Sequence, residues 1–216
     1  GGTADGTGTY AYGTDANVTA EPNVGYVFNG WTGASVASPT SATTYIHLTD
    51  DTNITANFAI AQYTLSLTSE PPEGGEVAGE GQFDYGATNA ITAIPATGYQ
   101  FTGWSGGTPA DANASSTTII LSEPTTLTAK FEKILYEVQV TVIPAGASTI
   151  SGTGFYELDE NVTLSVIPIK GYEFSHWSGA ILTSYASQTQ TLTVTGNLNL
   201  VVTCERHVDA GTLSYA

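Results

Sequence analysis

Basic residues are scarce in this sequence, which has 4 Lys and Arg against 20 Asp and Glu and a formal net charge of −16. Proteins that bind a nucleic-acid backbone use clustered Lys and Arg to displace counterions. An anionic membrane surface attracts proteins through the same side chains. The composition therefore excludes nucleic acids as partners and argues against binding to a charged membrane surface. The basic residues are Lys130, Lys133, Lys170 and Arg206.

Sulfur-containing residues are almost absent as well. There is no methionine, which predicts that the chain is a processed product or a fragment, because translation starts at methionine. The single cysteine, Cys204, cannot form a disulfide within the chain, and we interpret it as a small buried apolar residue. No apolar run approaches the roughly 20 residues of a membrane-spanning helix, so we expect no membrane insertion.

Charged residues of both signs make up only 11% of the chain. The Lys- and Glu-rich surfaces of soluble helices are missing, whereas Thr, Gly and Tyr are abundant. This composition is typical of β-rich proteins outside the cell. We therefore expect an all-β protein that is extracellular or located at the cell surface.

The three tryptophans stand in nearly the same nine-residue segment, 73 residues apart. The segments are GYVFNGWTG (25–33), GYQFTGWSG (98–106) and GYEFSHWSG (171–179). Residues before and after these segments keep the same period, so three copies of one unit span nearly the whole chain. We place the units at residues 1–61, 62–133 and 134–206, followed by the start of a fourth at 207–216.

Each unit has the pattern of several short strands. In the third copy, apolar and polar residues alternate along 136–144 and again along 161–168, which ends at a proline. Such alternation is typical of half-buried strands, and no segment has helical spacing over three turns. The sequence predicts three small all-β modules in series, sandwich-like or β-grasp-like, in an elongated chain.

We interpret the aromatic residues of the repeated segment as the anchors of each module's core. A unit of about 70 residues has a small core, and large aromatic rings bury the most apolar area per residue. Strand alternation places the tyrosine and phenylalanine on one face and the tryptophan on the other. The alternative is a solvent-facing aromatic platform that stacks on sugar rings. The anchors are Tyr26, Phe28, Trp31, Tyr99, Phe101, Trp104, Tyr172, Phe174 and Trp177.

A glycine-punctuated segment, a strand before a proline, the aromatic segment and a closing strand recur in this order. The first copy reads GTGTYAYGTDANVTAEPNVGYVFNGWTG and closes with NITANF (53–58), and the second closes with TLTAKF (126–131). This pattern resembles the divergent internalin B-repeat family, although the third copy departs from it at His176 and Cys204. The resemblance implies small β-rich modules in secreted or surface-attached bacterial and archaeal proteins. It also implies spacing, adhesion or scaffolding, usually without catalysis.

The sequence contains no catalytic or metal-binding motif. His47, His176 and His207 occupy different positions in their repeats, and none has a partner at metal-ligand spacing. No nucleophile elbow occurs either, so we expect no enzymatic activity and no cofactor. Calcium prefers oxygen ligands, which the acidic segments 49–53 and 111–113 contain. We interpret both segments as solvated turns, with calcium binding as the alternative.

Four N-x-S/T sequons are candidate glycosylation sites. Asn113 is the best of them, because it falls in the long Ser/Thr/Ala-rich loop of the second copy. The others are Asn17, Asn53 and Asn161.

The first module lacks an opening strand. By the 73-residue period, residues 1–2 align with 74–75, so nothing in the first module corresponds to residues 63–70 of the second. A missing strand leaves an unpaired sheet edge and an exposed apolar stripe. We therefore expect a strand from elsewhere to bind there.

The tail, residues 207–216, begins a fourth copy. Its Leu213 and Tyr215 fall in phase with Val140 and Val142 of the third copy, which makes them candidates for strand donation. Two interpretations stay open. Either the chain is a fragment of a longer stalk or adhesin, or the tail of one subunit fills the empty position of the next. In the second case a head-to-tail filament forms.

The predicted function is that of a non-enzymatic extracellular structural repeat protein. It is a cell-surface stalk or adhesin segment, or a filament built by strand donation. Its expected partners are further copies of itself or neighbouring repeats of a longer chain. The alternatives are a carbohydrate-binding module, with glycans as partners, and an accessory region of a secreted enzyme.

Overall fold

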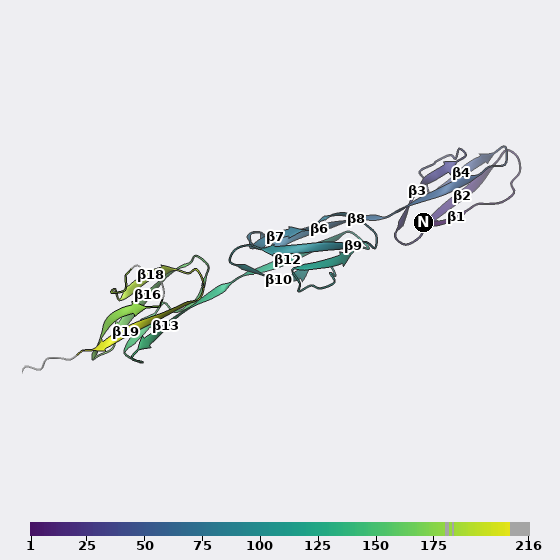
Figure 1. Cartoon of the computed structure of the whole chain (residues 1–216). Helices are drawn as coiled ribbons and strands as arrows, with labels where there is room; N and C mark the ends of the chain where they lie inside the picture. Colours follow the sequence, from purple (N-terminus) through teal and green to yellow (C-terminus); the bar gives the residue numbers. More distant parts are fainter. Residues whose placement is uncertain (180–181, 183, 208–216) are drawn as a thin grey trace, which may run out of the picture. The chain divides into compact units, whose positions relative to one another are not determined.

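The computed structural model describes residues 1–179, 182 and 184–207, and most of them lie in strands (Figure 1). The chain forms two compact units: Gly1–Ala96 with Phe101–Phe131, and Thr97–Gln100 with the chain from Glu132 onward. The first unit holds most of the strands of two repeats, and the second holds those of one. We call residues 1–61, 62–133 and 134–206 the first, second and third module.

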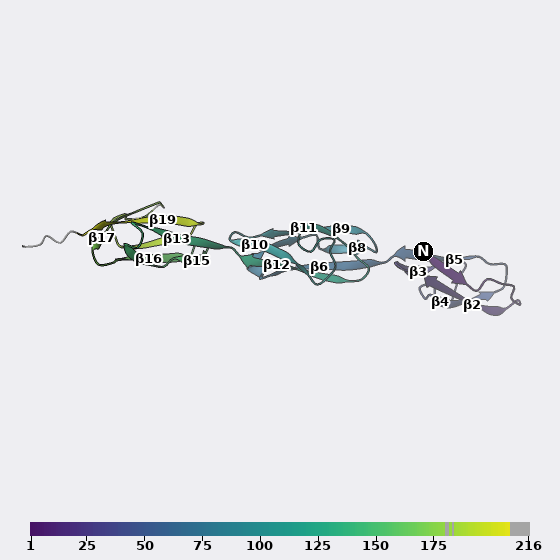
Figure 2. The same ribbon diagram turned by 90° about the horizontal axis from the view of Figure 1, so that it is seen from below.

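The second and third modules each consist of a four-stranded and a three-stranded sheet (Figures 1 and 2). The two central strands of each larger sheet run parallel, a pairing that needs a long connection between them. In the second module the larger sheet consists of β8 (Gly81–Asp84), β6 (Gln62–Glu70), β12 (Thr125–Lys133) and β10 (Tyr99–Ser105). The smaller sheet consists of β11 (Ser116–Ile120), β9 (Thr88–Pro95) and β7 (Gly75–Ala78), and the 3-10 turn η1 (Pro72–Gly74) lies between β6 and β7 in the chain. In the third module the larger sheet consists of β15 (Gly154–Glu157), β13 (Leu135–Ile143), β19 (Leu198–Arg206) and β17 (Tyr172–Ser178). Its smaller sheet consists of β14 (Ser148–Ser151), β16 (Asn161–Pro168) and β18 (Thr189–Thr193).

The two sheets of a module face each other and enclose its core. In the third module, Val162, Leu164 and Val166 alternate inward along β16. They pack against Val138 of β13 and Leu200 of β19, and all five are buried. Two sheets with interdigitating inner faces make a β-sandwich. The described residues contain only the turn η1 as helix, so no helix packs on either sheet.

The first module has the smaller sheet but only part of the larger one. Its strands are β1 (Gly2–Asp5), β2 (Thr14–Pro22) and β4 (Thr43–Leu48) in one sheet, and β3 (Tyr26–Gly33) and β5 (Ile54–Ile60) in the other. The structure describes every residue of this module, and none of them forms a counterpart of β6 or β8. The sequence predicted one missing strand here, whereas two strand positions are without a strand.

The aromatic segment does not alternate as the sequence predicted. The pairing of β17 with β19 shifts at a bulge between Phe174 and His176, and β3 has the same bulge between Phe28 and Gly30. A bulge inserts one extra residue into the alternation. As a result Phe174 and Trp177 face the same core, with ring centroids 6.3 Å apart. The prediction that phenylalanine and tryptophan lie on opposite faces is wrong.

The tryptophans are the most deeply buried of the nine aromatic residues: Trp31, Trp104 and Trp177 are 7, 6 and 1% exposed. Each indole N–H donates to the carbonyl ten residues further on, at 2.8 to 3.0 Å, and so holds the intervening loop against the core. Tyr26 does not join the core. It is 37% exposed, because it begins β3 at the end of its module and pairs with the exposed Ile60. The partly buried residues are Phe28, Tyr99, Phe101, Tyr172 and Phe174.

Candidate functional site

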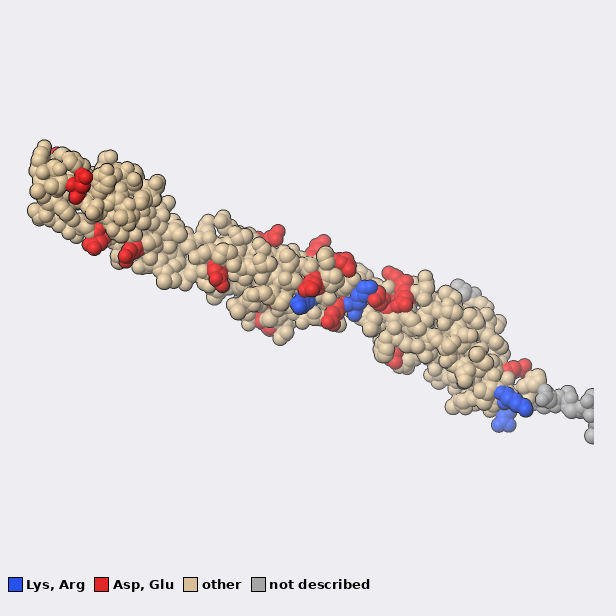
Figure 3. All heavy atoms as spheres, turned by 180° about the vertical axis from the view of Figure 1, so that it is seen from behind, with Lys and Arg blue, Asp and Glu red and all other residues tan. Residues whose placement is uncertain are grey.

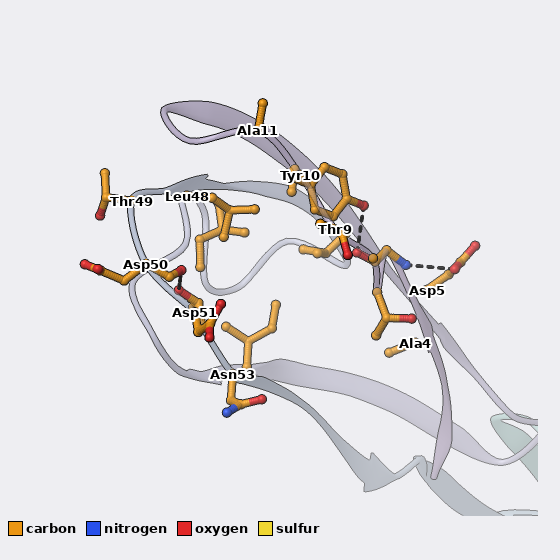
Figure 4. A pocket seen from close by; sticks show the side chains of 18 of the residues that line it. Ala4, Asp5, Thr9, Tyr10, Ala11, Leu48, Thr49, Asp50, Asp51 and Asn53 are labelled. Atoms are coloured by element: carbon orange, nitrogen blue, oxygen red, sulfur yellow. Dashed lines mark hydrogen bonds between the residues drawn. The ribbon is translucent and has the colours of Figure 1, made fainter.

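A cavity of about 620 Å³ opens in the first module, at the position that β6 occupies in the second (Figure 4). Its floor includes the core residues Val18, Trp31 and Ile46. Its two walls are residues 4–12 and residues 48–54, and Figure 4 shows their side chains on either side of the opening. We call this cavity the strand groove.

One wall of the strand groove continues into β5, whose apolar residues are incompletely covered. Ile54, Ala56 and Phe58 are only partly buried. β12 and β19 each pair with a parallel neighbour, β6 or β13, and β5 has no such neighbour among the described residues. β5 therefore presents an unpaired backbone edge beside an apolar surface. The residues at the same positions of β12 and β19 are all buried; they are Leu127, Ala129, Phe131, Leu200, Val202 and Cys204.

The opposite wall is held in place without a strand partner. Tyr10 Oη donates to Gly6 O at 2.8 Å, just as Tyr156 Oη donates to Gly152 O at 2.7 Å in the third module. Residues 8–11 correspond to the edge strands β8 and β15, yet they form no strand themselves. Their backbone lacks the neighbour with which β8 and β15 pair, so this wall is shaped but unpaired.

The geometry is suited to one extended strand, parallel to β5 and antiparallel to residues 8–11. The register of β6 with β12 carries over by the repeat: the position of Leu65 falls opposite Thr52, and that of Leu67 opposite Ile54. Both leucines are buried in the second module. A strand in the groove would make backbone hydrogen bonds on two sides and would need apolar side chains at alternate positions.

The rim of the strand groove is acidic, since Asp5, Asp50 and Asp51 line it. On the face drawn in Figure 3, acidic side chains are scattered singly or in small groups and basic ones are few. A strand with several carboxylates would be repelled by this rim. The rim is compatible with a strand such as residues 62–70, in which Glu70 is the only charged residue.

The wall formed by residues 4–12 was not predicted from the sequence. The signal was available in the repeat, because residues 8–11 align with two edge strands that are paired in the other modules. The wall was not predicted because the glycine-rich segment of the first copy has no apolar alternation of its own. The predicted donor residues Leu213 and Tyr215 lie outside the described residues.

The predicted histidines and the cysteine form no common site. His47 Nδ1 lies 2.8 Å from Asp15 Oδ1 in the first module, whereas His176 and His207 are in the third module or directly after it. Within residues 1–179, 182 and 184–207, no three His, Cys, Asp or Glu gather as metal ligands do. Cys204 is buried with its thiol free.

The acidic segments are turns closed by their own hydrogen bonds. The Asp111 carboxylate accepts the N–H of Asn113 at 2.8 Å, and Thr52 Oγ1 donates to Asp50 O at 2.8 Å. Asn113, the candidate for glycosylation, is exposed in the loop between β10 and β11. The placement of the indole rings does not support a sugar-stacking platform, because their faces are covered by the core.

The chain was also compared with known proteins. The family model of the divergent InlB B-repeat domain matches it three times, at residues 1–62, 65–135 and 138–206. No curated protein matches the chain. Among solved structures, the Bacillus anthracis TIE protein is similar at 12% identity and a TM-score of 0.35, over 89% of this chain and 43% of that one. The chain therefore spans less than half the length of that structure. Among the residues that the structure describes, no helix is long and apolar enough to cross a bilayer.

Proposed function

Because the chain belongs to the divergent InlB B-repeat family, whose model matches all three modules, we propose that it is a non-enzymatic structural protein of the cell exterior. Its modules serve as a stalk or adhesin segment at the cell surface. Copies of the chain join head to tail by strand donation, so that the strand following the third module of one copy completes the first module of another. The partner is thus a second copy of the same chain.

The observation that carries this proposal is the open edge of β5. Its Ile54 and Phe58 are partly exposed, whereas their counterparts in the complete modules are buried. Burying one large aliphatic or aromatic side chain completely is worth about 1.5–3 kcal/mol. An unpaired strand edge is also a template for another strand. Both the apolar surface and the backbone edge therefore favour binding of a strand.

The tail can enter the strand groove in two registers. In the register of the repeat, Leu213 takes the position of Leu67, and Gly211 takes that of Leu65. A shift by two residues brings Leu213 to the position of Leu65 and Tyr215 to that of Leu67. Both registers keep the same side chains inward, because the side-chain period of a strand is two.

Peptide binding tests whether the groove accepts a strand. The receptor is the chain with residues 208–216 deleted, and its Trp104→Phe and Trp177→Phe substitutions leave Trp31, on the groove floor, as the fluorescent reporter. A peptide with the sequence of residues 64–70 is expected to raise the unfolding temperature of the first module. At 100 times its Kd, the stabilisation is about 2.7 kcal/mol.

The matched control peptide has serine at the positions of Leu65 and Leu67, and it is expected to leave the unfolding temperature unchanged. Equal effects of the two peptides, or none from either, would contradict a specific strand site.

Copy-to-copy donation is measured separately by sedimentation of the full chain. Association is expected to increase with concentration and to disappear when residues 208–216 are deleted. If the chain stays monomeric while the peptide binds, the donated strand comes from a neighbouring repeat of a longer chain, and the head-to-tail proposal is wrong.

A further inference from the structure

One backbone hydrogen bond recurs at the end of every module. Ala61 N–H donates to Gly25 O at 2.9 Å at the end of the first module, and the equivalent bond from Ile134 N–H to Gly98 O is 2.8 Å long. His207 N–H donates to Gly171 O at 3.0 Å after the third module. The three modules therefore end in the same backbone arrangement, whether or not a further module is present in the structure.

At the first two ends, a residue of the following module packs onto the glycine. A Cβ at Gly25 would lie 2.2 Å from Tyr85 Cδ1, and a Cβ at Gly98 would lie 3.4 Å from Leu158 Cβ. Tyr85 and Leu158 occupy the same repeat position and are both partly buried. We call the glycine surface the socket, and the turn that carries Tyr85 or its equivalent the docking loop.

The third socket is open, and the first docking loop is uncovered. No described atom lies within 4 Å of a Cβ placed at Gly171, apart from its chain neighbours. Tyr12, at the repeat position of Tyr85, is 84% exposed. The side chain of Tyr12 and the socket at Gly171 are thus both without a partner among the described residues, whereas their equivalents within the chain contact each other.

The uncovered docking loop already has the conformation of the docked one. Gly13 and Gly86, which follow the two tyrosines, both have φ +76°, in the left-handed region that glycine tolerates. The N–H of Gly13 donates to Leu48 O at 2.7 Å, and that of Gly86 donates to Leu121 O at 2.9 Å. The turn that carries Tyr12 therefore shares these backbone features with the turn that carries Tyr85.

We propose that Tyr12 of one copy docks in the Gly171 socket of a second copy, as Tyr85 docks on Gly25 within the chain. The inference rests on the proposed function, because strand donation is what brings these two ends together. The socket and the docking loop are different surfaces, so the contact is heterologous and each added copy presents a new socket. The contact orients the second copy, and the donated strand supplies most of the affinity.

The first test removes the tyrosine. Tyr12→Ser is expected to weaken association of the full chain about tenfold in sedimentation, which corresponds to about 1.4 kcal/mol. Tyr45→Ser is the matched control, because Tyr45 is also exposed but lies on β4, outside the groove lining. The control is expected to associate like the unaltered chain. Because Tyr12 also lines the strand groove, binding of the 64–70 peptide is measured for both variants, and only a loss of association larger than any loss of peptide binding supports the docking contact.

The second test fills the socket. Gly171→Asn is expected to weaken association at least as much as Tyr12→Ser, because a side chain there takes the place of the tyrosine ring. Gly196→Asn is the control, since a Cβ at Gly196 also meets open space, in the turn before β19. Unfolding of the third module is recorded for both variants, because φ at Gly171 is +89° and asparagine is strained there.

The outcomes separate this inference from the proposed function. Unchanged association of Tyr12→Ser, together with loss of association on deletion of residues 208–216, overturns the docking contact and leaves strand donation standing. A full chain that does not associate at any concentration overturns both. If Gly171→Asn unfolds the third module, Tyr12→Ser decides alone.

Discussion

Replacing Gly75 with alanine is expected to destabilise the second module because of a clash with Phe131. A Cβ on Gly75 would lie 2.6 Å from Phe131 Cζ, which is shorter than side-chain contacts in proteins. The backbone itself accepts alanine, since φ at Gly75 is 165° and therefore extended. In the third module the same two positions hold Ser148 and Cys204. The residue at the first position is larger where the residue at the second is smaller.

The expected magnitudes follow from overpacking and from cavity formation. Gly75→Ala alone should cost about 1–3 kcal/mol, the usual range for inserting a methyl group into a packed core. Phe131→Cys alone should cost about 3–5 kcal/mol, as for truncating a buried phenylalanine. In the double variant the Phe131 ring is absent, so the alanine at position 75 has no ring to clash with. The double variant should therefore be more stable than the sum of the single effects implies, by about 1–2 kcal/mol.

A second contact of the added Cβ does not change this expectation. The Cβ would also lie 2.5 Å from Ile94 O. Ser148 carries a Cβ at the same place on the edge of its sheet, opposite Pro168, so the backbone can adjust there. The ring of Phe131 is what distinguishes the two modules.

The measurement is a double-mutant cycle in urea, under reducing conditions. Trp31→Phe and Trp177→Phe in every member leave Trp104 as the reporter, and its ring lies 5.6 Å from Phe101, which in turn contacts Phe131. If the two effects add to within about 0.5 kcal/mol, the two positions are independent and the steric explanation is wrong.

Three further predictions concern other contacts. Cys204→Phe, although it restores the residue of the other two modules, should destabilise the third by about 1–3 kcal/mol, because Ala147 is fully buried beside it; an unchanged or higher unfolding temperature would argue against this. Trp104→Phe should cost about 1–3 kcal/mol in urea unfolding, since the Ala114 carbonyl loses the indole N–H at 3.0 Å; a cost no larger than that of an exposed substitution would show that the bond contributes nothing. Gly211→Val should strengthen association about tenfold if the tail binds in the repeat register, because the valine then occupies a buried position; no change in sedimentation would indicate the register shifted by two residues.

The 73-residue repeat alone predicts part of the strand groove. Aligning residues 1–2 with 74–75 was enough to predict a missing strand, because a period without insertions assigns every residue an equivalent. The alignment did not reveal that Tyr10 and Gly6 keep the second wall in shape through a hydrogen bond. It also did not distinguish Tyr12, which is exposed, from Tyr85, which a glycine of the preceding module covers. Exposure depends on what lies next to a residue in space, and identical positions in a repeat differ in that respect at the chain's ends.

The sequence by itself determined the all-β class, the three-fold repeat and the family, because alternation and period are properties of residue order. The tertiary structure decided which faces meet. The bulge after Phe174 turns Trp177 into the same core as the phenylalanine, and the parallel pairing of β13 with β19 joins segments far apart in the chain. Neither feature has a local signature, because a bulge and a long-range pairing are selected by the packing of two complete sheets and not by the propensity of any one segment.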